Sequence, residues 1–169
     1  MRPEEELEVA RDLARPLVAR FSPAEEGEIF VVLGEAYLAD PVGVTRPGRS
    51  PGPLAFGLPD VVVLLTPIAL TAMTEVVRYV VEAGLRRGHR ATGTLVRRLF
   101  RPSGQDPADS TTDAGPEERS SADGPLELTA AEWNEIHRIV ERTAVQGGVA
   151  PPRAALIADA VVGAGRRKE

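Results

Sequence analysis

Cysteine is absent from this chain of 169 residues. Its absence excludes disulfides, thiolate nucleophiles, cysteine-bound zinc and iron–sulfur clusters. A chain of this length buries enough apolar surface to fold without disulfides. Because cysteine is absent, we expect a protein of a reducing compartment. The only imidazole groups belong to His89 and His137, which lie far apart in the sequence. We therefore expect neither a metal site nor a cofactor.

Lysine is nearly absent, because Lys168 is the only one and arginine supplies the rest of the 20 basic residues. Heavy use of alanine, valine, glycine and proline indicates GC-rich codon bias, so arginine alone is weak evidence for phosphate binding. The net charge of -5 argues against a general nucleic-acid binder. Residues 1–6 are acidic, where a secretory signal is basic and then apolar. We expect a cytoplasmic protein, with attachment to the inner face of the membrane as the alternative.

Sequence signals for catalysis are weak. Gly84, Gly88 and Gly93 are too widely spaced for a phosphate-binding loop, whose backbone N–H groups must approach the phosphates closely. His137 and Glu141 stand one helical turn apart, which is the spacing of an acid/base couple. A histidine at the margin of an apolar helix face is more often a packing residue. We expect no catalytic residue, and an enzyme without a recognisable motif is an alternative.

Two helices are predicted in the N-terminal part. Residues 4–21 carry apolar side chains at helical spacing, with Pro16 on the solvent side. Ser22, Pro23 and Glu25 then form a capping-box pattern that predicts a helix starting at Pro23. A strand over residues 29–33 is the weaker alternative, since its apolar residues do not alternate. The predicted buried face of the second helix consists of Ile29, Val32, Leu33, Ala36 and Tyr37.

Residues 41–59 are rich in proline and glycine and predict a long loop, whereas residues 61–81 are strongly apolar. Thr66 as N-cap and Pro67 as first helical residue predict the start of a central helix there. The stretch is also long enough to span a membrane. Its eleven Leu, Ile and Val residues favour insertion by roughly 3 to 7 kcal/mol, and Glu75 and Arg78 oppose it by roughly 5 to 7 kcal/mol. A buried helix is favoured, and a membrane-inserting effector is an alternative.

Glu75 and Arg78 are three residues apart on this predicted helix, which predicts an ion pair between them. The following segment, residues 85–101, is basic and contains no acidic residue. Wound as a helix, it places an apolar stripe beside arginines, which suits an anionic membrane face or a partner protein better than nucleic acid. A solvated arginine surface is the simpler interpretation. The candidate contact residues are Arg86, Arg87, Arg90, Arg97, Arg98, Arg101, Leu95, Leu99 and Phe100.

Residues 102–125 are acidic, rich in Ser, Asp, Gly and Pro, and nearly free of large apolar side chains, so they predict a disordered linker. A capping box from Thr129 to Glu132 then starts a helix that ends at Gly147, and Pro151 starts another. This hairpin has too little core to be stable alone. It is expected to dock on the first part of the chain or on a partner through Trp133, Ile136, Val140, Leu156 and Ile157.

The sequence thus predicts an all-α protein, a small irregular helical bundle with a C-terminal helical hairpin joined by a disordered acidic linker. The helical module covers residues 1–101, the linker 102–125 and the hairpin 126–169. The favoured function is a non-enzymatic interaction or regulatory module that contacts a partner protein or an anionic membrane surface.

Overall fold

The computed structural model describes residues 2–40, 64–88, 92–100 and 127–166. These residues form six α-helices, one short 3-10 helix and no strand, which confirms the all-α prediction. The elements are α1 (Pro3–Phe21), η1 (Pro23–Glu25), α2 (Glu28–Ala39), α4 (Leu65–Arg86), α5 (Gly93–Phe100), α6 (Ala130–Gln146) and α7 (Pro151–Arg166). The loop predicted at 41–59 and the linker predicted at 102–125 lie outside the described residues.

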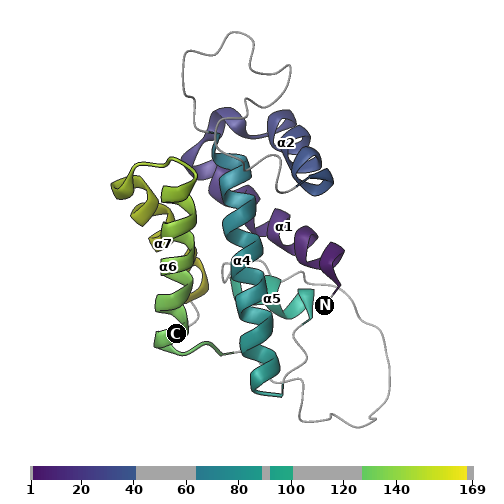
Figure 1. Ribbon diagram of the computed structural model, residues 1–169, viewed down its shortest axis with the longest axis vertical. Helices are drawn as coiled ribbons and strands as arrows, with labels where there is room; N and C mark the ends of the chain where they lie inside the picture. Colours follow the sequence, from purple (N-terminus) through teal and green to yellow (C-terminus); the bar gives the residue numbers. More distant parts are fainter. Residues whose placement is uncertain (1, 41–63, 89–91, 101–126, 167–169) are drawn as a thin grey trace, which may run out of the picture.

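Helix α4 is the centre of the bundle, with α1 and α2 on one side and the hairpin of α6 and α7 on the other (Figure 1). Its first six residues, from Leu65 to Leu70, are all buried, because a stretch that is apolar on every side has no face to offer to water. Val76, Val77 and Val80 continue the buried side further along the helix. The predicted central helix is therefore present.

The N-terminus of α4 is capped by a carboxylate from a distant part of the chain. Glu25, at the end of η1, is buried, and its two carboxylate oxygens accept hydrogen bonds from the backbone N–H groups of Leu65 and Thr66, each at 2.8 Å. The Ser22 hydroxyl donates a third hydrogen bond to it at 2.7 Å. The next residue, Pro67, has no N–H group. Glu25 thus satisfies every backbone donor in the first three helical positions and places a negative charge at the positive end of the helix dipole.

This cap corrects two predicted helix starts. No α-helix starts at Pro23, because the chain makes only the single turn η1 there and α2 begins at Glu28. Gly27, which precedes Glu28, has a φ of 83°, a left-handed conformation that interrupts the helix. Thr66 is not the N-cap of α4 either. It lies inside the first turn, and its buried hydroxyl has no hydrogen-bond partner among the described residues.

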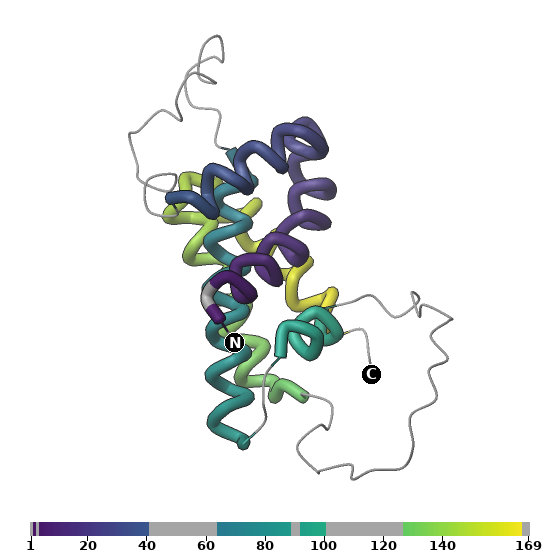
Figure 2. Tube along the Cα trace, turned by 90° about the vertical axis from the view of Figure 1, so that its right-hand side faces the viewer, coloured from purple at the N-terminus to yellow at the C-terminus, as the bar shows by residue number. Residues whose placement is uncertain are grey.

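Helix α1 continues without interruption past Pro16, which lies on its exposed side as predicted. The opposite side buries Ala14 and Val18 in the core that α1 shares with α4. Helix α5 lies against the N-terminal half of α1 (Figure 2). The two helices approach closely at Gly93, where an added Cβ would lie 3.0 Å from both Glu5 and Val9. A glycine at this position therefore lets α5 pack on α1.

Helices α6 and α7 form the predicted hairpin, and their apolar residues join one hydrophobic core with those of α1, α2, α4 and α5. The capping box of α6 is present, because the Thr129 hydroxyl accepts a hydrogen bond from the Glu132 N–H at 3.3 Å. In return, the Glu132 carboxylate accepts one from the Thr129 N–H at 2.8 Å. The hairpin therefore docks on the N-terminal helices of its own chain.

Four of the five predicted docking residues are buried, namely Trp133, Ile136, Val140 and Ile157. The prediction for Leu156 is wrong, because its side chain is 60% exposed. The buried side of α7 consists of Ile157 and of small residues that recur at helical spacing, namely Ala154, Ala158, Val161 and Gly165. Leu156 lies opposite this side of the helix.

The indole of Trp133 is held between α5 and α7. The Phe100 ring meets it edge-on, with ring centroids 5.8 Å apart and an interplanar angle of 82°. On the α7 side, an added Cβ at Gly165 would lie only 2.0 Å from the indole, so only glycine fits there without a shift. Gly147, the C-cap of α6, is also a position where only glycine fits without a shift, because an added Cβ would lie 2.5 Å from Ile68.

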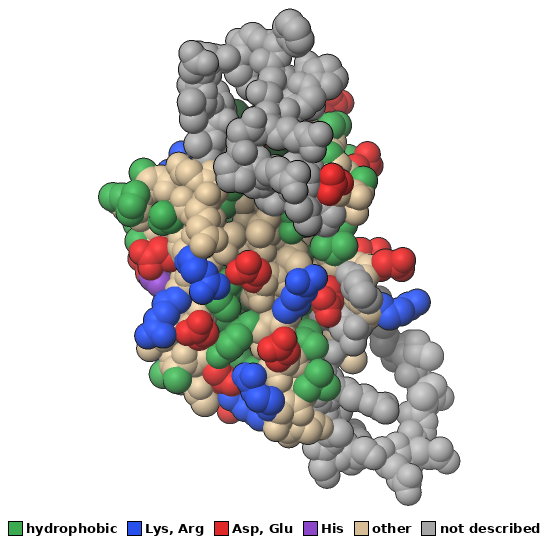
Figure 3. All heavy atoms as spheres, in the orientation of Figure 1, with side chains coloured by type: hydrophobic (Ala, Val, Ile, Leu, Met, Phe, Trp, Pro, Cys, Tyr) green, Lys and Arg blue, Asp and Glu red, His purple; other side chains and the backbone are tan. Residues whose placement is uncertain are grey.

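Ion pairs link neighbouring helices across the surface, where positive and negative side chains alternate (Figure 3). The predicted pairing of Glu75 with Arg78 is not the one that forms. Arg78 lies 3.4 Å from Glu6 of α1, and Glu75 lies 3.6 Å from Arg142 of α6 and accepts a hydrogen bond from Thr143 at 3.2 Å. Each charge therefore bridges to another helix.

Candidate interaction surfaces

The basic segment predicted at 85–101 is divided between two helices. Arg86 and Arg87 lie at the C-terminal end of α4. Helix α5 contains Leu95, Arg97, Arg98, Leu99 and Phe100. His89, Arg90 and Arg101 lie outside the described residues.

Helix α5 does not offer its apolar stripe to a membrane or a partner. Leu99 and Phe100 are buried, Val96 is fully buried, and only Leu95 is partly exposed. All three buried residues belong to the core of the protein. The expectation that Leu99 and Phe100 form a contact surface is therefore wrong for the folded chain, because the docking of α5 on α1, α4 and α7 already uses them.

Arginines of this segment also have intramolecular partners. Arg97 donates to Asp12 of α1 at 2.7 Å, and Arg87 donates to the Glu132 carboxylate and to the Glu127 carbonyl oxygen. Burial raises the pKa of Glu132, but hydrogen bonds from Thr129 and Arg87 outweigh this effect and hold the pKa below its usual value. Two of the candidate cations are thus engaged in holding helices together.

Helix α2 carries an exposed apolar surface that the sequence interpretation missed. Phe30, Leu33 and Tyr37 on its inner side are buried. On the outer side, Ile29 is 47% exposed and Val32 is 48% exposed. Two smaller apolar residues extend this line toward the C-terminus of the helix and are also exposed. We call this line the α2 seam, and it consists of Ile29, Val32, Ala36 and Ala39.

The predicted buried face of this helix is correct only for Leu33 and Tyr37, because Ile29, Val32 and Ala36 face solvent. The helix is apolar on nearly every side, so helical periodicity could not select which side is buried. The sequence did contain one signal of an unusual surface at α2. Residues 22–40 contain acidic residues but no basic one. In the space-filling view, the visible side chains over α2 are likewise hydrophobic and acidic (Figure 3).

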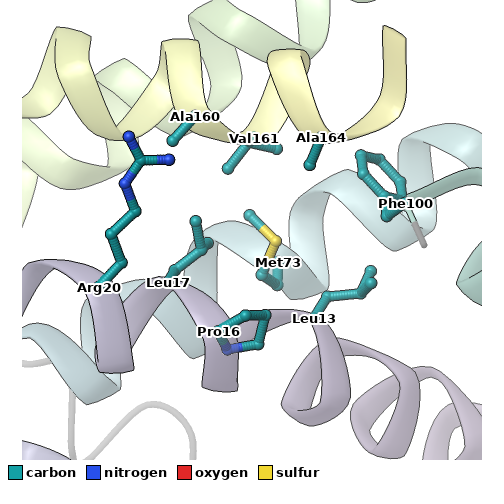
Figure 4. Close-up of a pocket in the computed structure, with 9 residues that line it drawn as sticks. All are labelled: Leu13, Pro16, Leu17, Arg20, Met73, Phe100, Ala160, Val161 and Ala164. Carbon is teal, nitrogen blue, oxygen red and sulfur yellow. The ribbon is translucent and has the colours of Figure 1, made fainter. Parts of the chain in front are cut away.

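A shallow trough lies between α1 and α7, with Met73 of α4 at its floor and Phe100 of α5 at one end (Figure 4). Its volume is about 160 Å³. The described residues that line it are apolar except Arg20, whose guanidinium also stacks over the Phe21 ring. Catalysis needs a nucleophile or a base beside the substrate, and this lining supplies neither.

His137 lies on the hairpin surface between two carboxylates. Its Nε2 is 3.1 Å from Asp159 of α7, and its Nδ1 is 3.8 Å from Glu141 of α6. On another side of α6, burial raises the pKa of Tyr79 of α4, and the charges of Glu132 and Glu135 raise it further. The trough does not include His137. The histidine thus joins α6 to α7 at the surface.

The sequence also matches the G-x-S-x-G pattern around Ser50, a match that the sequence interpretation overlooked. That pattern is meaningful where a strand turns into a helix, whereas prolines stand at positions 47, 51 and 53. Ser50 lies outside the described residues. Within the described ranges, no group of three or more His, Asp or Glu side chains is placed to bind a metal ion. No helix in those ranges is long and apolar enough to cross a membrane.

The described residues form a small all-helical bundle in which the outer side of α2 is apolar and exposed. Comparison of the chain with protein-family models, with curated proteins and with solved structures found no match. Function is therefore inferred from the surfaces of this chain.

Proposed function

We propose that this protein is a helical interaction module that binds a helix of a partner protein on the α2 seam. The observation that carries the proposal is the exposure of Ile29 and Val32, each close to half of its surface, on a helix that is apolar nearly all round. Helices of this composition are normally buried on all sides. A contiguous exposed apolar line marks an interaction site more often than scattered single residues do.

A protein partner is favoured over an anionic membrane. The apolar stripe of α5, which would enter a bilayer interface, is part of the core, and Arg97 is paired with Asp12. The outer side of α2 is acidic at Glu28 and Glu35, and these charges would be repelled by anionic lipid headgroups. The exposed apolar side chains of α2 are thus ones that an anionic membrane would not attract.

A binding function is also favoured over an enzymatic one. The trough between α1 and α7 has an apolar lining with a single guanidinium, and it lacks the convergent polar groups that catalytic pockets contain. The exposed side of α2, by contrast, carries apolar residues at intervals of three and four positions. This is the spacing of the anchor residues through which amphipathic helices bind partner proteins.

Site-specific photo-crosslinking in cells of the source organism tests the proposal. A photo-reactive amino acid is placed at position 32 and, in a matched control, at position 156, where Leu156 is also strongly exposed but stands alone on α7. Position 32 should give one dominant protein adduct that position 156 does not give. The adduct should disappear with Ile29→Asp while the melting temperature stays unchanged. Absence of an adduct at position 32, or the same adducts from both positions, would contradict the proposal.

A further inference from the structure

We infer that the segment bound by the α2 seam is an amphipathic helix whose apolar stripe is bordered by lysine or arginine. This inference rests on the proposed function and adds the chemistry of the partner. It follows from three properties of α2: the spacing of its exposed apolar residues, the charges beside them, and their sizes.

The spacing of the α2 seam is that of a coiled-coil interface. Ile29 and Ala36 are seven residues apart and take the place of a positions, while Val32 and Ala39 take the place of d positions. The core-facing residues Phe30, Leu33 and Tyr37 then fall at b and e. The helix therefore fills one apolar side with its own chain and exposes the α2 seam, while Val31 and Leu38, which are also exposed, fall at c positions beyond Glu28 and Glu35.

The charges beside the seam select the partner. Glu28 and Glu35 both take the g position, which borders the a/d line and in coiled coils pairs with charges of the facing helix. Both are exposed, and neither forms an ion pair with a described residue. A facing helix with basic residues at its border places a cation against each carboxylate. A facing helix with acidic residues at its border would instead place like charges next to these carboxylates.

The same charges disfavour a second copy of this chain as the occupant. In an antiparallel pair of α2 helices, the g positions face each other, so Glu28 would meet Glu35 of the other copy. In a parallel pair, the g position at Glu35 pairs with the next e position, where the helix has ended at its C-cap, Asp40, which is also acidic. Neither arrangement offers a cation to the carboxylates of α2. The complementary occupant is therefore a basic helix of a different protein.

The sizes of the seam residues indicate how that helix lies. Ile29 and Val32 are bulky, whereas Ala36 and Ala39 are small, so the partner helix approaches more closely at the C-terminal half of α2. Large side chains such as leucine fill the space above the alanines. Because α2 has only 12 residues, it is about 18 Å long and offers a small contact area. The complex is therefore weak and reversible.

Two synthetic helical peptides of equal length test the inference with the purified full chain. Both carry leucine at every a and d position, and their bordering positions are lysine in one peptide and glutamate in the other. We expect the lysine peptide to bind about tenfold more tightly at low salt, because Glu28 and Glu35 attract its lysines and repel the glutamates of the other peptide. Fluorescence anisotropy of the labelled peptides measures the difference, which should shrink as salt rises.

Charge reversal on the protein separates a specific contact from general adsorption of a cationic peptide to an acidic protein. Glu28→Lys together with Glu35→Lys should reverse the preference, so that the glutamate peptide binds better. Val32→Asp should weaken binding of the lysine peptide about tenfold or more, whereas Leu156→Asp, the control at an exposed apolar residue of α7, should leave the affinity unchanged.

Equal binding of both peptides, or a preference that the double reversal leaves unchanged, would overturn the inference. Concentration-dependent dimerisation that Val32→Asp abolishes would also overturn it, because the occupant would then be a second copy. These outcomes are distinct from a failure of the proposed function. If position 32 gives a protein adduct in cells but the peptides show no charge preference, the interaction module stands and the basic helix is wrong.

Discussion

Replacement of Glu25 by alanine tests the long-range cap of α4. The carboxylate is only 6% exposed, and it accepts hydrogen bonds from two backbone N–H groups of a different helix. A hydrogen bond to a charged acceptor contributes about 1.5 to 3 kcal/mol, and loss of an ordinary N-cap costs about 0.5 to 2 kcal/mol. Water that enters the vacated space replaces part of these contacts. We therefore expect Glu25→Ala to lower the free energy of unfolding by about 3 kcal/mol.

Urea unfolding followed by circular dichroism and by Trp133 fluorescence measures this loss. The midpoint should move to lower urea with an unchanged slope, because the substitution alters stability and not the surface exposed on unfolding. For a chain of this size, the melting temperature should fall by about 6 to 12 °C. Glu25→Gln keeps one acceptor oxygen but removes the charge, so its effect should be intermediate.

Glu26 supplies the matched control, since it is the next residue and its side chain is exposed. Glu26→Ala should change the free energy of unfolding by less than about 0.5 kcal/mol. A loss below about 1 kcal/mol for Glu25→Ala, or a loss equal to that of Glu26→Ala, would refute the assignment of Glu25 as the cap of α4 in solution.

Three further predictions concern the hairpin. Gly165→Ala should destabilise the protein by about 1 to 3 kcal/mol, because the added Cβ lies 2.0 Å from the indole of Trp133. Gly163→Ala, where nothing lies within 4 Å of the added Cβ, should stabilise by up to about 1 kcal/mol, and thermal melting that ranks the two variants the other way would contradict the packing. Trp133→Ala should cost about 3 to 5 kcal/mol in urea unfolding, and water-exposed tryptophan emission from the folded wild type would show that the indole is not buried. The pKa of Glu132 is lowered by folding, so its contribution to stability is complete above its unfolded value of about 4.5 and is lost as pH falls through the lower folded value. Urea midpoints between about pH 3 and 6 should therefore depend less on pH in Glu132→Gln than in the wild type, and identical pH profiles would exclude this linkage.

Local rules predicted well where the relevant partners are close in the sequence. The capping box of α6 joins Thr129 to Glu132, three residues away, and the structure contains both of its hydrogen bonds. The same pattern at Ser22 gave a wrong helix start. The acceptor there, Glu25, binds N–H groups 40 and 41 residues away, and such a partner has no local signature.

Helical periodicity was reliable only where one side of a helix is polar. Along α1 it identified the exposed position of Pro16. In α2, apolar residues occur on nearly every side, and the predicted face mixed buried Leu33 with exposed Val32. In α7, the buried side is made of Ile157 and of smaller residues, so the adjacent Leu156 was mistaken for a core residue. The choice among apolar sides depends on what each side meets in the tertiary structure.

The stripe of α5 was identified correctly as apolar and basic, but its role was not. Its hydrophobic residues suit a membrane interface and a protein core equally well, and only the position of α1 and α4 decides between them. Arg97 illustrates the same limit, because its partner Asp12 lies 85 residues away. The α2 seam could have been suspected from the absence of basic residues in residues 22–40.

The contacts of Trp133 bear on how the protein comes apart. Phe100 of α5 and Gly165 of α7 meet the same indole, so three helices share one side chain at their junction. None of them can detach without exposing a large aromatic surface to water. A junction of this kind couples α5, α6 and α7, so we expect these three helices to unfold together in one cooperative step. A chain cut between α5 and α6 would then yield two fragments that reassociate through the indole, as in fragment complementation, and not two independent domains.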